Sequence, residues 1–393
     1  AEVYSQMIVL STTNNGDGAF LNLGDNQYTD FIALQNGILD WKTKQLLPWS
    51  KDYTHTTMIE ATWADQAQES EAWKLWDDAL HSWIDDEDTI KFLQEYIGYA
   101  LLPSCKMRTA VFLHGEGANG KSLFIDVVQS LFASSSIVTQ PVAMSSRFGS
   151  ACLIDKLLVV CSDIDSTYLD KTGVLKQLIA GDRLRAEYKG GKEFDFVPVC
   201  KLLFSANKLP KSSDKSHGWY SRLQLVHFPH QFEPDAKYYS TIMNTMRSPE
   251  GRSALLAWAI EGLQRLETQG TWTIGKSMRD SKAEYRRDND NVLAFASDVL
   301  EPSPIKDDSY KTSLIIKAVY HTYKEWCSDV GMKAASQQEF TTRLASTYAK
   351  KSLRWKTGST WKSHQSFLNV QFKEECDFDG KSSYDLYTNI ACK

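Results

Sequence analysis

Residues 111–125 contain the feature that most constrains the fold: an apolar run, a glycine-punctuated turn and a second apolar run. The turn matches the pattern G-x-x-x-x-G-K-[ST], with its fixed positions at Gly115, Gly120, Lys121 and Ser122. Glycine reaches backbone angles that are closed to other residues, so successive N–H groups can converge on phosphate oxygens at the positive end of a following helix. The pattern therefore predicts a strand, a phosphate-binding loop and a helix.

This loop makes ATP and Mg²⁺ the expected ligands. Lys121 would neutralise the β- and γ-phosphates, and Ser122 would be a ligand of Mg²⁺. The other contacts to the nucleotide are expected from the loop and the first helical turn, namely from Gly115, Glu116, Gly117, Ala118, Asn119, Gly120 and Leu123. A flexible Gly/Asn turn is the alternative interpretation, and the flanking strand and helix patterns argue against it.

The composition is that of a globular protein with more than one domain. The chain has 393 residues, of which 42% are hydrophobic and 12% aromatic, enough for two or three cores. It has no run of 18 apolar residues and no secretory signal, so we expect a soluble, intracellular protein without membrane contact. The seven cysteines include no C-x-x-C pair, which predicts neither a disulfide framework nor a zinc site. The first residue is Ala1 rather than Met, which indicates a fragment or a processed product.

Charge is unevenly distributed along the chain, although the formal net charge is −5. Residues 1–105 carry 17 Asp/Glu against 5 Lys/Arg. Residues 106–230 carry 16 Lys/Arg against 11 Asp/Glu, and residues 301–393 carry 14 against 11. A local basic surface on an acidic protein is therefore expected.

The segment before the loop predicts small hairpins followed by helices. Residues Phe31–Trp41 predict a strand, a turn at Asn36-Gly37 and a second strand. A second small hairpin is expected around Pro48. Two amphipathic helices are expected between Glu69 and Leu102. The first carries an apolar stripe at helical spacing, which indicates a core face rather than a base-stacking surface. The stripe consists of Trp73, Trp76, Leu80 and Trp83.

Two acidic residues follow an apolar strand downstream of the loop. Leu157–Ser162 is a continuous apolar run, typical of a strand buried on both faces, and it ends in Asp163 and Asp165. A nucleotide site needs a carboxylate at the end of the strand next to the phosphate-loop strand, to hold the hydration shell of Mg²⁺ and orient the attacking water. We therefore expect this strand beside the loop strand, with Asp163 on the metal and Asp165 as a second catalytic candidate. Ordinary turn residues are the alternative.

A lysine-tipped hairpin is predicted at residues 182–197. The residues on both sides of Lys189-Gly-Gly-Lys192 alternate in the pattern of two strands, so two cations and Tyr188 are expected at the tip of the hairpin. Such a tip is suited to gripping backbone phosphates of a nucleic acid. A solvated turn is the alternative.

Two further polar residues stand at the ends of strands. Cys200–Asn207 is an apolar strand that ends in an amide, and Asn207 at that point can reach the γ-phosphate or the attacking water. Arg222 stands just before a strand. In a ring ATPase this is where an arginine would reach the nucleotide of the neighbouring subunit and stabilise transition-state charge.

The order of these signals resembles that of a known helicase module. The signals are, in chain order, Gly115–Ser122, the strand ending in Asp163, the lysine-tipped hairpin, Phe204–Pro210, and Arg222 before Val226–Pro229. Together they resemble the helicase module of the phage, plasmid and poxvirus primase-helicases, a branch of the superfamily 3 helicases within the AAA+ ATPases. Asn119 inside the loop is typical of that branch.

The resemblance extends over most of the chain and implies four parts. Residues 1–105 are similar to the mixed α+β and helical domain that precedes the ATPase in this family. Residues 106–235 resemble the AAA+ type P-loop ATPase core, an α/β fold with a parallel central sheet. Residues 236–300 resemble the helical continuation of that core, and residues 301–393 a small winged-helix domain.

The winged-helix domain is a candidate to bind DNA or a partner protein. The cations that would do so are Arg343, Lys350, Lys351 and Arg354. An ordinary solvated face is the alternative. The primase region often found upstream in this family is absent from the sequence, so a primase domain or protein is a candidate partner.

The resemblance implies an ATP-dependent DNA helicase or translocase of a phage or mobile-element replication system, in the cytoplasm of a bacterial cell or a virus-infected host cell. A homo-oligomeric ring, expected to be a hexamer, would move on single-stranded DNA, although no residue separates DNA from RNA. Polarity, origin specificity and host stay open. The alternatives are a P-loop nucleotide phosphotransferase and a non-motor, ATP-binding replication initiator or scaffold.

Two positions depart from the family pattern. Many relatives have a glutamate or adjacent acids where this chain has Asp163-Ile-Asp165, so the carboxylate that serves the metal stays open between the two. Relatives often have two consecutive arginines where this chain has Ser221-Arg222, which makes Arg222 the single finger candidate at that place.

Overall fold

A computed structural model of the chain describes residues 29–50, 53, 55–146, 148–162, 164, 169, 172–212, 214–233, 235–357 and 360–373. The chain separates into two units, Ala1–Lys282 and Ala283–Lys393. Each unit is described by itself, and the four-part division expected from the sequence stays a prediction.

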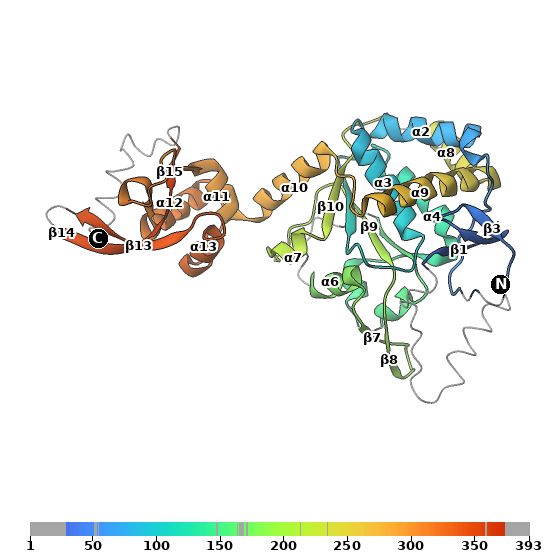
Figure 1. The fold of residues 1–393 in the computed structure, drawn as a ribbon, viewed down its shortest axis with the longest axis horizontal. Coiled ribbons are helices and arrows are strands. Elements are labelled where there is room, and N and C mark those ends of the chain that lie inside the picture. Colours follow the sequence, from blue (N-terminus) through green and yellow to red (C-terminus); the bar gives the residue numbers. More distant parts are fainter. Residues whose placement is uncertain are drawn as a thin grey trace. The chain divides into compact units, whose positions relative to one another are not determined.

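The first unit alternates strands and helices (Figure 1). Its strands are β1 (Phe31–Leu34), β2 (Gly37–Asp40), β3 (Gln45–Leu47), β4 (Ala110–His114), β5 (Ser136–Val138), β6 (Leu158–Cys161), β7 (Leu184–Glu187), β8 (Glu193–Phe196), β9 (Lys201–Ala206) and β10 (Leu223–His227). Its helices are α2 (Glu71–Trp83), α3 (Glu87–Ala100), α4 (Lys121–Phe132), α5 (Pro141–Met144), α6 (Thr172–Ala180), α7 (His217–Tyr220), α8 (Ala236–Arg247), α9 (Pro249–Gln269) and the first part of α10 (Lys276–Asn289). Single 3₁₀ turns are η2 (Ala67–Glu69), η3 (Ala133–Ser135) and η4 (Ser150–Leu153).

A five-stranded parallel sheet lies at the centre of the first unit, with the strand order β10-β4-β9-β6-β5. The strands β4, β6 and β9 are apolar and almost fully buried, as expected for strands covered on both faces. His114 at the end of β4 pairs with Ala206 of β9 on one side and with His227 of β10 on the other. The carboxyl ends of these three strands therefore meet at one edge.

The position of β6 corrects a prediction. The strand that ends before Asp163 was expected beside the phosphate-loop strand, but β9 lies between β6 and β4. Parallel strands are joined by long crossovers, so neighbours in sequence need not be neighbours in the sheet. The strand that ends in Asn207 takes the expected place instead.

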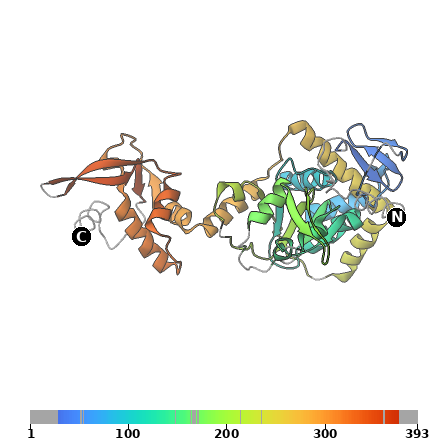
Figure 2. The ribbon, with the colours of Figure 1, turned by 90° about the horizontal axis from the view of Figure 1, so that it is seen from below.

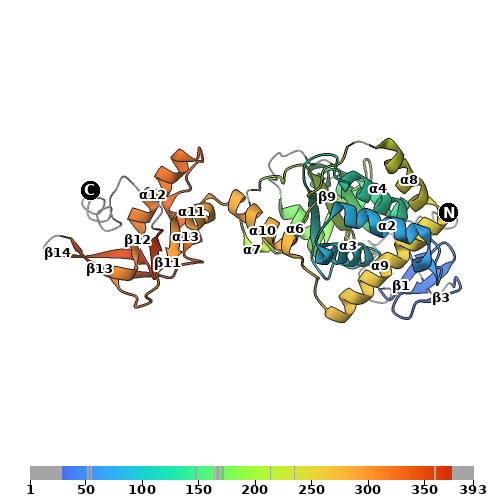
Figure 3. The ribbon, with the colours of Figure 1, turned by 90° about the horizontal axis from the view of Figure 1, so that it is seen from above.

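Four helices, α2, α3, α4 and α9, pack together beside the sheet (Figure 3). The backbones of α3 and α9 touch because glycine stands at the crossing on both helices. A Cβ on Gly98 would lie 2.1 Å from the carbonyl oxygen of Ala259, and one on Gly262 would lie 2.3 Å from the backbone of Gln94. The helix before the strands of the central sheet, α3, is therefore in direct backbone contact with the helix after them, α9.

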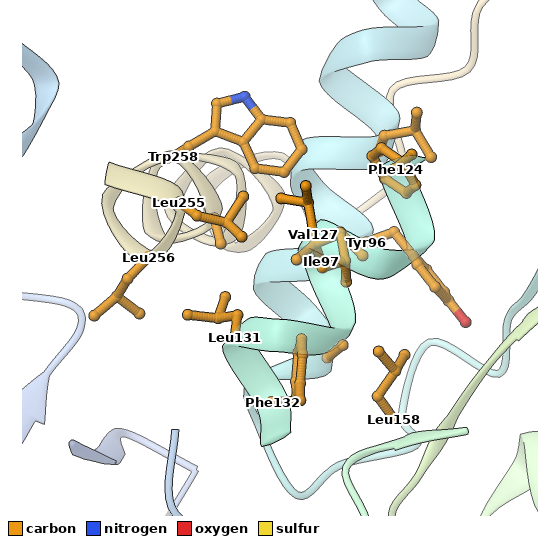
Figure 4. Close-up of a cluster of buried hydrophobic side chains, with 14 of the residues drawn as sticks. Tyr96, Ile97, Phe124, Val127, Leu131, Phe132, Leu158, Leu255, Leu256 and Trp258 are labelled. Atoms are coloured by element: carbon orange, nitrogen blue, oxygen red, sulfur yellow. The ribbon is translucent and has the colours of Figure 1, made fainter. Parts of the chain in front are cut away.

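The apolar core of the first unit lies where these helices meet. Leu255 and Trp258 of α9 point toward Val127 and Leu131 of α4, as Figure 4 shows. On α3, the buried Tyr96 donates its hydroxyl hydrogen bond to Leu202 O of β9 at 2.8 Å. The core thus joins the helices to the central sheet.

A small antiparallel sheet, β1-β2-β3, precedes the helices and lies beside α9 (Figure 2). The predicted Asn36-Gly37 turn is confirmed, since β1 pairs with β2 across it. The predicted hairpin around Pro48 is wrong: β3 pairs back onto β2 and Pro48 follows β3. Gln264 of α9 donates to Trp41 O at 2.9 Å and ties this sheet to the helix.

The aromatic stripe of α2 belongs to the core, as predicted. Trp76, Leu80 and Trp83 are buried, and Trp73 packs against the same cluster. The Trp76 ring stacks on Phe124 of α4 with centroids 5.7 Å apart. The stripe therefore joins α2 to the helix that follows the phosphate loop.

The second unit combines helices with a three-stranded sheet of order β12-β14-β13. Its helices, after the end of α10, are α11 (Asn291–Val299), α12 (Ile316–Asp329) and α13 (Gln337–Leu344), with the 3₁₀ turn η5 (Tyr310–Thr312). Its strands are β11 (Leu300–Pro302), β12 (Leu314–Ile315), β13 (Lys350–Thr357), β14 (Thr360–Phe367) and β15 (Val370–Phe372). Phe295, Tyr323, Phe340 and Phe367 lie at the centre of its core.

Candidate functional site

The phosphate-loop sequence connects β4 to α4 in the structure. Gly115 and Gly120 have φ angles of 143° and 92°, which other residues rarely adopt. A Cβ on Gly115 would lie 2.5 Å from Phe228 O, and one on Gly120 would lie 2.6 Å from the Trp83 ring. Both the backbone angle and the crowding therefore require glycine, and Trp83 of the core stripe supports the loop.

Lys121 is the first residue of α4, and its side chain is buried. Its ammonium group donates to Gly115 O at 2.6 Å, to Glu116 O at 3.3 Å and to Asn119 Oδ1 at 2.9 Å. The amide of Asn119 in turn donates to Phe228 O, just after β10, at 3.2 Å. The lysine is thus held inside the loop, and Asn119 joins the loop to the neighbouring strand.

Several backbone N–H groups of the loop have no acceptor among the residues that the structure describes. They are those of Gly117, Ala118, Asn119, Gly120 and Ser122. They lie at the N-terminus of α4, a helix of 12 residues, where the helix dipole places partial positive charge. Unpaired N–H donors at such a terminus fit the oxygen atoms of a phosphate chain.

A cavity of about 650 Å³ opens beside the loop. Its walls come from the loop, the end of α2, the end of β9 and the segment that leads into α8; the lining residues are Ser82, Trp83, Gly117–Leu123, Ser205, Asn207, Phe232, Glu233, Asp235, Tyr238 and Tyr239. A nucleoside triphosphate fits a cavity of this size and polarity.

Three aromatic residues of this cavity were missed in the sequence: Phe232, Tyr238 and Tyr239. Each is exposed by about two fifths despite its apolar ring. The backbone N–H of Phe232 donates to Ala118 O at 2.8 Å, and the Tyr239 hydroxyl donates to Asp126 Oδ2 of α4 at 2.6 Å. A run of aromatics at the start of a helix was the available signal, but only the fold brings it to the loop about 115 residues earlier.

His114 stands at the end of β4, directly before the loop. Its ring stacks on His227 with centroids 4.9 Å apart. Burial, with smaller contributions from His227 and Lys121, lowers the pKa of His114 to about 3. This imidazole is therefore neutral near pH 7 and adds no positive charge to that of Lys121.

Asn207 follows β9 and lines the cavity, directly beside the strand that carries the loop. The two carboxylates predicted for the metal and for catalysis, Asp163 and Asp165, lie outside the described residues. Between them in sequence, Ile164 donates its backbone N–H to Ser205 O of β9 at 2.9 Å.

The segment between Asn207 and Arg222 is held by one carboxylate. Asp214 accepts hydrogen bonds from Lys176 at 2.6 Å and from Thr172 at 2.9 Å, both on α6. Burial alone would raise the pKa of Asp214, but the bonds from Lys176, Ser216 and Thr172 outweigh it and hold that pKa well below its usual range. This carboxylate therefore stays charged and ties α6 to the chain that leads toward Arg222.

Arg222 lies at the opposite edge of the sheet from the phosphate loop. Leu223 pairs with Ala110 at the start of β4, so the length of a five-residue strand, about 16 Å, separates Arg222 from the loop edge. Its Nη1 donates to Gly218 O, and its buried Nε has no acceptor within the described part of the chain. The arginine is thus brought near neither Lys121 nor Asn207 of its own chain.

The predicted hairpin at residues 182–197 is present as β7 and β8. Figure 1 shows it at the end of the first unit away from α2. Lys189 and Lys192 are exposed at its tip, where neither has a carboxylate partner within the described residues. Tyr188 is 55% exposed, and its ring stacks on Phe194 of the same hairpin with centroids 5.1 Å apart.

Two features are absent from the described residues. No group of three or more His, Cys, Asp or Glu side chains is arranged to hold a metal ion. No helix among these residues is both long enough and apolar enough to cross a membrane.

Comparison with protein families gives three matches along the chain. Residues 24–81 match a family described as D5 N terminal like, and residues 287–380 match one described as Poxvirus D5 protein-like. Residues 113–222, which include the phosphate loop, match a family of unknown function, DUF5906.

Comparison with individual proteins gives a viral relative and a group of solved structures. The chain is 24% identical over 335 residues to "Putative helicase 121R" of Invertebrate iridescent virus 3, a match that covers 75% of this chain and 34% of the relative. The chain thus spans about a third of the length of that relative. Solved apo structures of the NrS-1 C-terminal region are 14% identical with a TM-score of 0.46, covering 94% of this chain and 90% of theirs.

Proposed function

The chain belongs to the primase-helicase family of phages and poxviruses, and from that premise we propose that it is an ATP-hydrolysing replication helicase. One observation carries this proposal. The Gly115–Ser122 loop presents unpaired N–H donors and a buried lysine to a cavity of about 650 Å³ at the carboxyl edge of a parallel sheet.

The loop would hold the phosphates of ATP. Its N–H groups would bind phosphate oxygens, and Lys121 would exchange its bonds to loop carbonyls for bonds to the β- and γ-phosphates. Mg²⁺, held by Ser122 and Asp163, would neutralise charge on the same phosphates. Asp165 and Asn207 are the candidates to position the attacking water.

The aromatic residues at the cavity supply a place for the base. Phe232 and Tyr238 present apolar ring surface beside the loop, and rings of this kind stack on nucleobases. The hydrogen bond from Tyr239 to Asp126 would keep α8 close to α4.

The position of Arg222 supports action between subunits in a ring. About one strand length separates it from the loop edge of its own chain, so it can serve as a finger only for the nucleotide of a neighbour. The strand order, with β9 inserted between β4 and β6, supports an AAA+ type core, and the helices and sheet of the second unit support a winged-helix domain. We propose a hexamer as its assembly.

Lys189, Lys192 and Tyr188 are the proposed contacts to single-stranded DNA in the channel of that ring. Two exposed lysines around a Gly-Gly tip bind backbone phosphates without reading sequence. The hairpin lies in the chain between β6 and β9, so movement at the nucleotide edge of either strand would displace it.

The test is steady-state ATP hydrolysis with and without single-stranded DNA across protein concentration, with particle size measured in parallel. Turnover should depend on Lys121, rise with DNA and rise with assembly. Lys121→Ala should abolish turnover in a folded protein, whereas Lys106→Ala, an exposed lysine outside the site, should not. If ATP turnover changes neither with DNA nor with assembly, a phosphotransferase is favoured instead.

Mixing of two inactive variants tests the role of Arg222. Arg222→Ala should lower kcat by about 10³, the scale of arginine fingers, with little loss of ATP affinity. Arg222→Ala and Lys121→Ala subunits should regain partial activity together, because each can complete the site that the other lacks. Absence of recovery in a mixture shown to co-assemble would place the role of Arg222 within one subunit.

A further inference from the structure

Residues 340–373 of the second unit form a segment of one charge sign. They contain seven Lys/Arg residues and no Asp or Glu. Most of this charge lies on the two strands β13 and β14, which pair along their whole length from Lys350↔Phe367 to Thr357↔Thr360. A polyanion is the ligand that complements such a surface.

The two faces of the β13–β14 hairpin differ. Paired residues of an antiparallel ladder share a face, and successive residues alternate. One face carries Leu353, Trp355 and Ser366 and packs on the core of the unit. The other face carries the exposed residues Ser352 and Arg354 on β13 and Trp361, Ser363 and Gln365 on β14; at its far end the exposed Lys350 pairs with Phe367, which is buried in the core.

The exposed cations of this hairpin stand apart from the acidic side chains that the structure describes. Lys350, Lys351, Arg354 and Lys362 make no ion pair with the carboxylates that the structure describes. Arg343 on α13 behaves differently, because it pairs with Asp290 at 3.0 Å and with Glu339. Charge that is available to a ligand is therefore on the hairpin and not on α13.

An aromatic residue stands among these cations. Trp361 is 46% exposed, and its ring touches Tyr310 edge-on, with centroids 5.8 Å apart. One edge of the indole is thus fixed by packing while much of its surface is open to solvent. Trp361 shares the exposed face with Arg354, which lies diagonally across the ladder.

The geometry points to the exposed face of β13–β14 as a second binding surface for single-stranded nucleic acid, separate from the β7–β8 tip. Lys350 and Arg354 bind backbone phosphates, and an unpaired base stacks on Trp361. Stacking favours a single strand over a duplex, because the bases of a duplex are already stacked and unavailable. This inference rests on the proposed function only for the identity of the ligand.

Binding of the full chain to a labelled oligothymidylate, measured by anisotropy without ATP at several salt concentrations, tests the inference. Each phosphate contact on a single strand contributes about 0.7 to the salt slope. Lys350→Ala/Arg354→Ala should therefore reduce the slope by about 1.4 and weaken binding about 20-fold at about 0.1 M salt. The matched control Lys317→Ala/Lys333→Ala removes two exposed lysines of the same unit and should change affinity less than about threefold.

Substitution of Trp361 separates stacking from charge. Trp361→Ala should weaken binding about tenfold with an unchanged salt slope, and Trp361→Phe should retain most of the affinity. A hairpin double variant that binds like the control, with the same cooperative unfolding as the parent chain, would overturn the inference. So would equal weakening toward a blunt duplex. Loss of ATP turnover in Lys121→Ala is read out separately, so the proposed function and this surface can fail independently.

Discussion

The two hairpins that carry lysines, β7–β8 and β13–β14, differ in the number and placement of their charged residues. Residues 184–196 contain three Lys/Arg and three Asp/Glu, whereas residues 350–367 contain five Lys/Arg and no acid. In β7–β8, Arg185 is paired with Glu193 and Asp195, each at 3.5 Å, which leaves the cations of the Gly-Gly tip as the exposed charge. In β13–β14 the exposed cations lie along the length of the hairpin, Lys350 and Arg354 on one face and Lys351 and Lys362 on the other.

This difference separates two ways of holding a polyanion. A hairpin of zero net charge with two cations at a narrow tip attracts weakly at long range and acts only on the phosphates that it touches. A hairpin with cations along its length and no acid attracts a polyanion over its whole length, so its binding depends less on any single contact. We therefore expect β7–β8 to govern movement of the nucleic acid and β13–β14 to govern its affinity.

The largest effect should come from the tip of β7–β8. Lys189→Ala/Lys192→Ala should lower the unwinding rate at least about 100-fold while DNA-independent ATP hydrolysis persists, because neither side chain lines the nucleotide cavity. Strand-separation kinetics and ATPase rates on one preparation provide the measurement. Lys208→Ala/Lys211→Ala, which removes two other exposed lysines of the same unit, is the control. Normal unwinding by the tip variant would leave β7–β8 as a surface turn.

A smaller effect should follow when β7–β8 is made to resemble β13–β14. Glu193→Gln/Asp195→Asn removes both partners of Arg185, so this arginine can take one additional phosphate contact. Single-strand affinity should rise about fivefold at about 0.1 M salt, and the salt slope should steepen by about 0.7. The free energy of unfolding should change by less than about 1 kcal/mol, because Arg185 is 71% exposed in these pairs. An unchanged slope would show that the acids do not mask the arginine.

The smallest effect on binding should come from Arg343, although this cation belongs to the same basic segment. Arg343→Ala should alter single-strand affinity less than about twofold, because its charge is already neutralised by two carboxylates. It should lower the free energy of unfolding of the second unit by about 2 kcal/mol, because the Asp290 side chain is only 5% exposed and would lose its counter-charge. Denaturant unfolding and anisotropy measure both quantities. A large loss of affinity with unchanged stability would assign Arg343 to the ligand.

Local patterns predicted the elements that depend on neighbours in sequence. The strand, glycine loop and helix around Lys121 follow from glycine angles and apolar runs, and the β7–β8 turn follows from its Gly-Gly tip. The stripe from Trp73 to Trp83 was correctly assigned to the core because its period matches one helical face. In these cases the information lies within about ten residues.

Arrangements set by tertiary packing were not predictable in this way. The insertion of β9 between β4 and β6 depends on how long crossovers pass the sheet, and no apolar run encodes it. Phe232 and Tyr238 reach the phosphate loop only because α8 packs on α4. Lys350, Lys351 and Arg354 were predicted from the sequence as candidate contacts, but which of them share a face with Trp361 required the ladder register.

The glycine crossing of α3 and α9 has a consequence for synthesis of the chain. Roughly 150 residues separate the end of α3 at Ala100 from the start of α9 at Pro249, so a ribosome that adds about 5 to 20 residues per second makes the first helix about seven to thirty seconds before the second. During that interval the face of α3 around Gly98, which packs on Ala259 and Leu263 of α9, lacks that partner. The nascent chain therefore exposes this face of α3 until α9 emerges from the exit tunnel, and chaperone occupancy on α3 should end at that point.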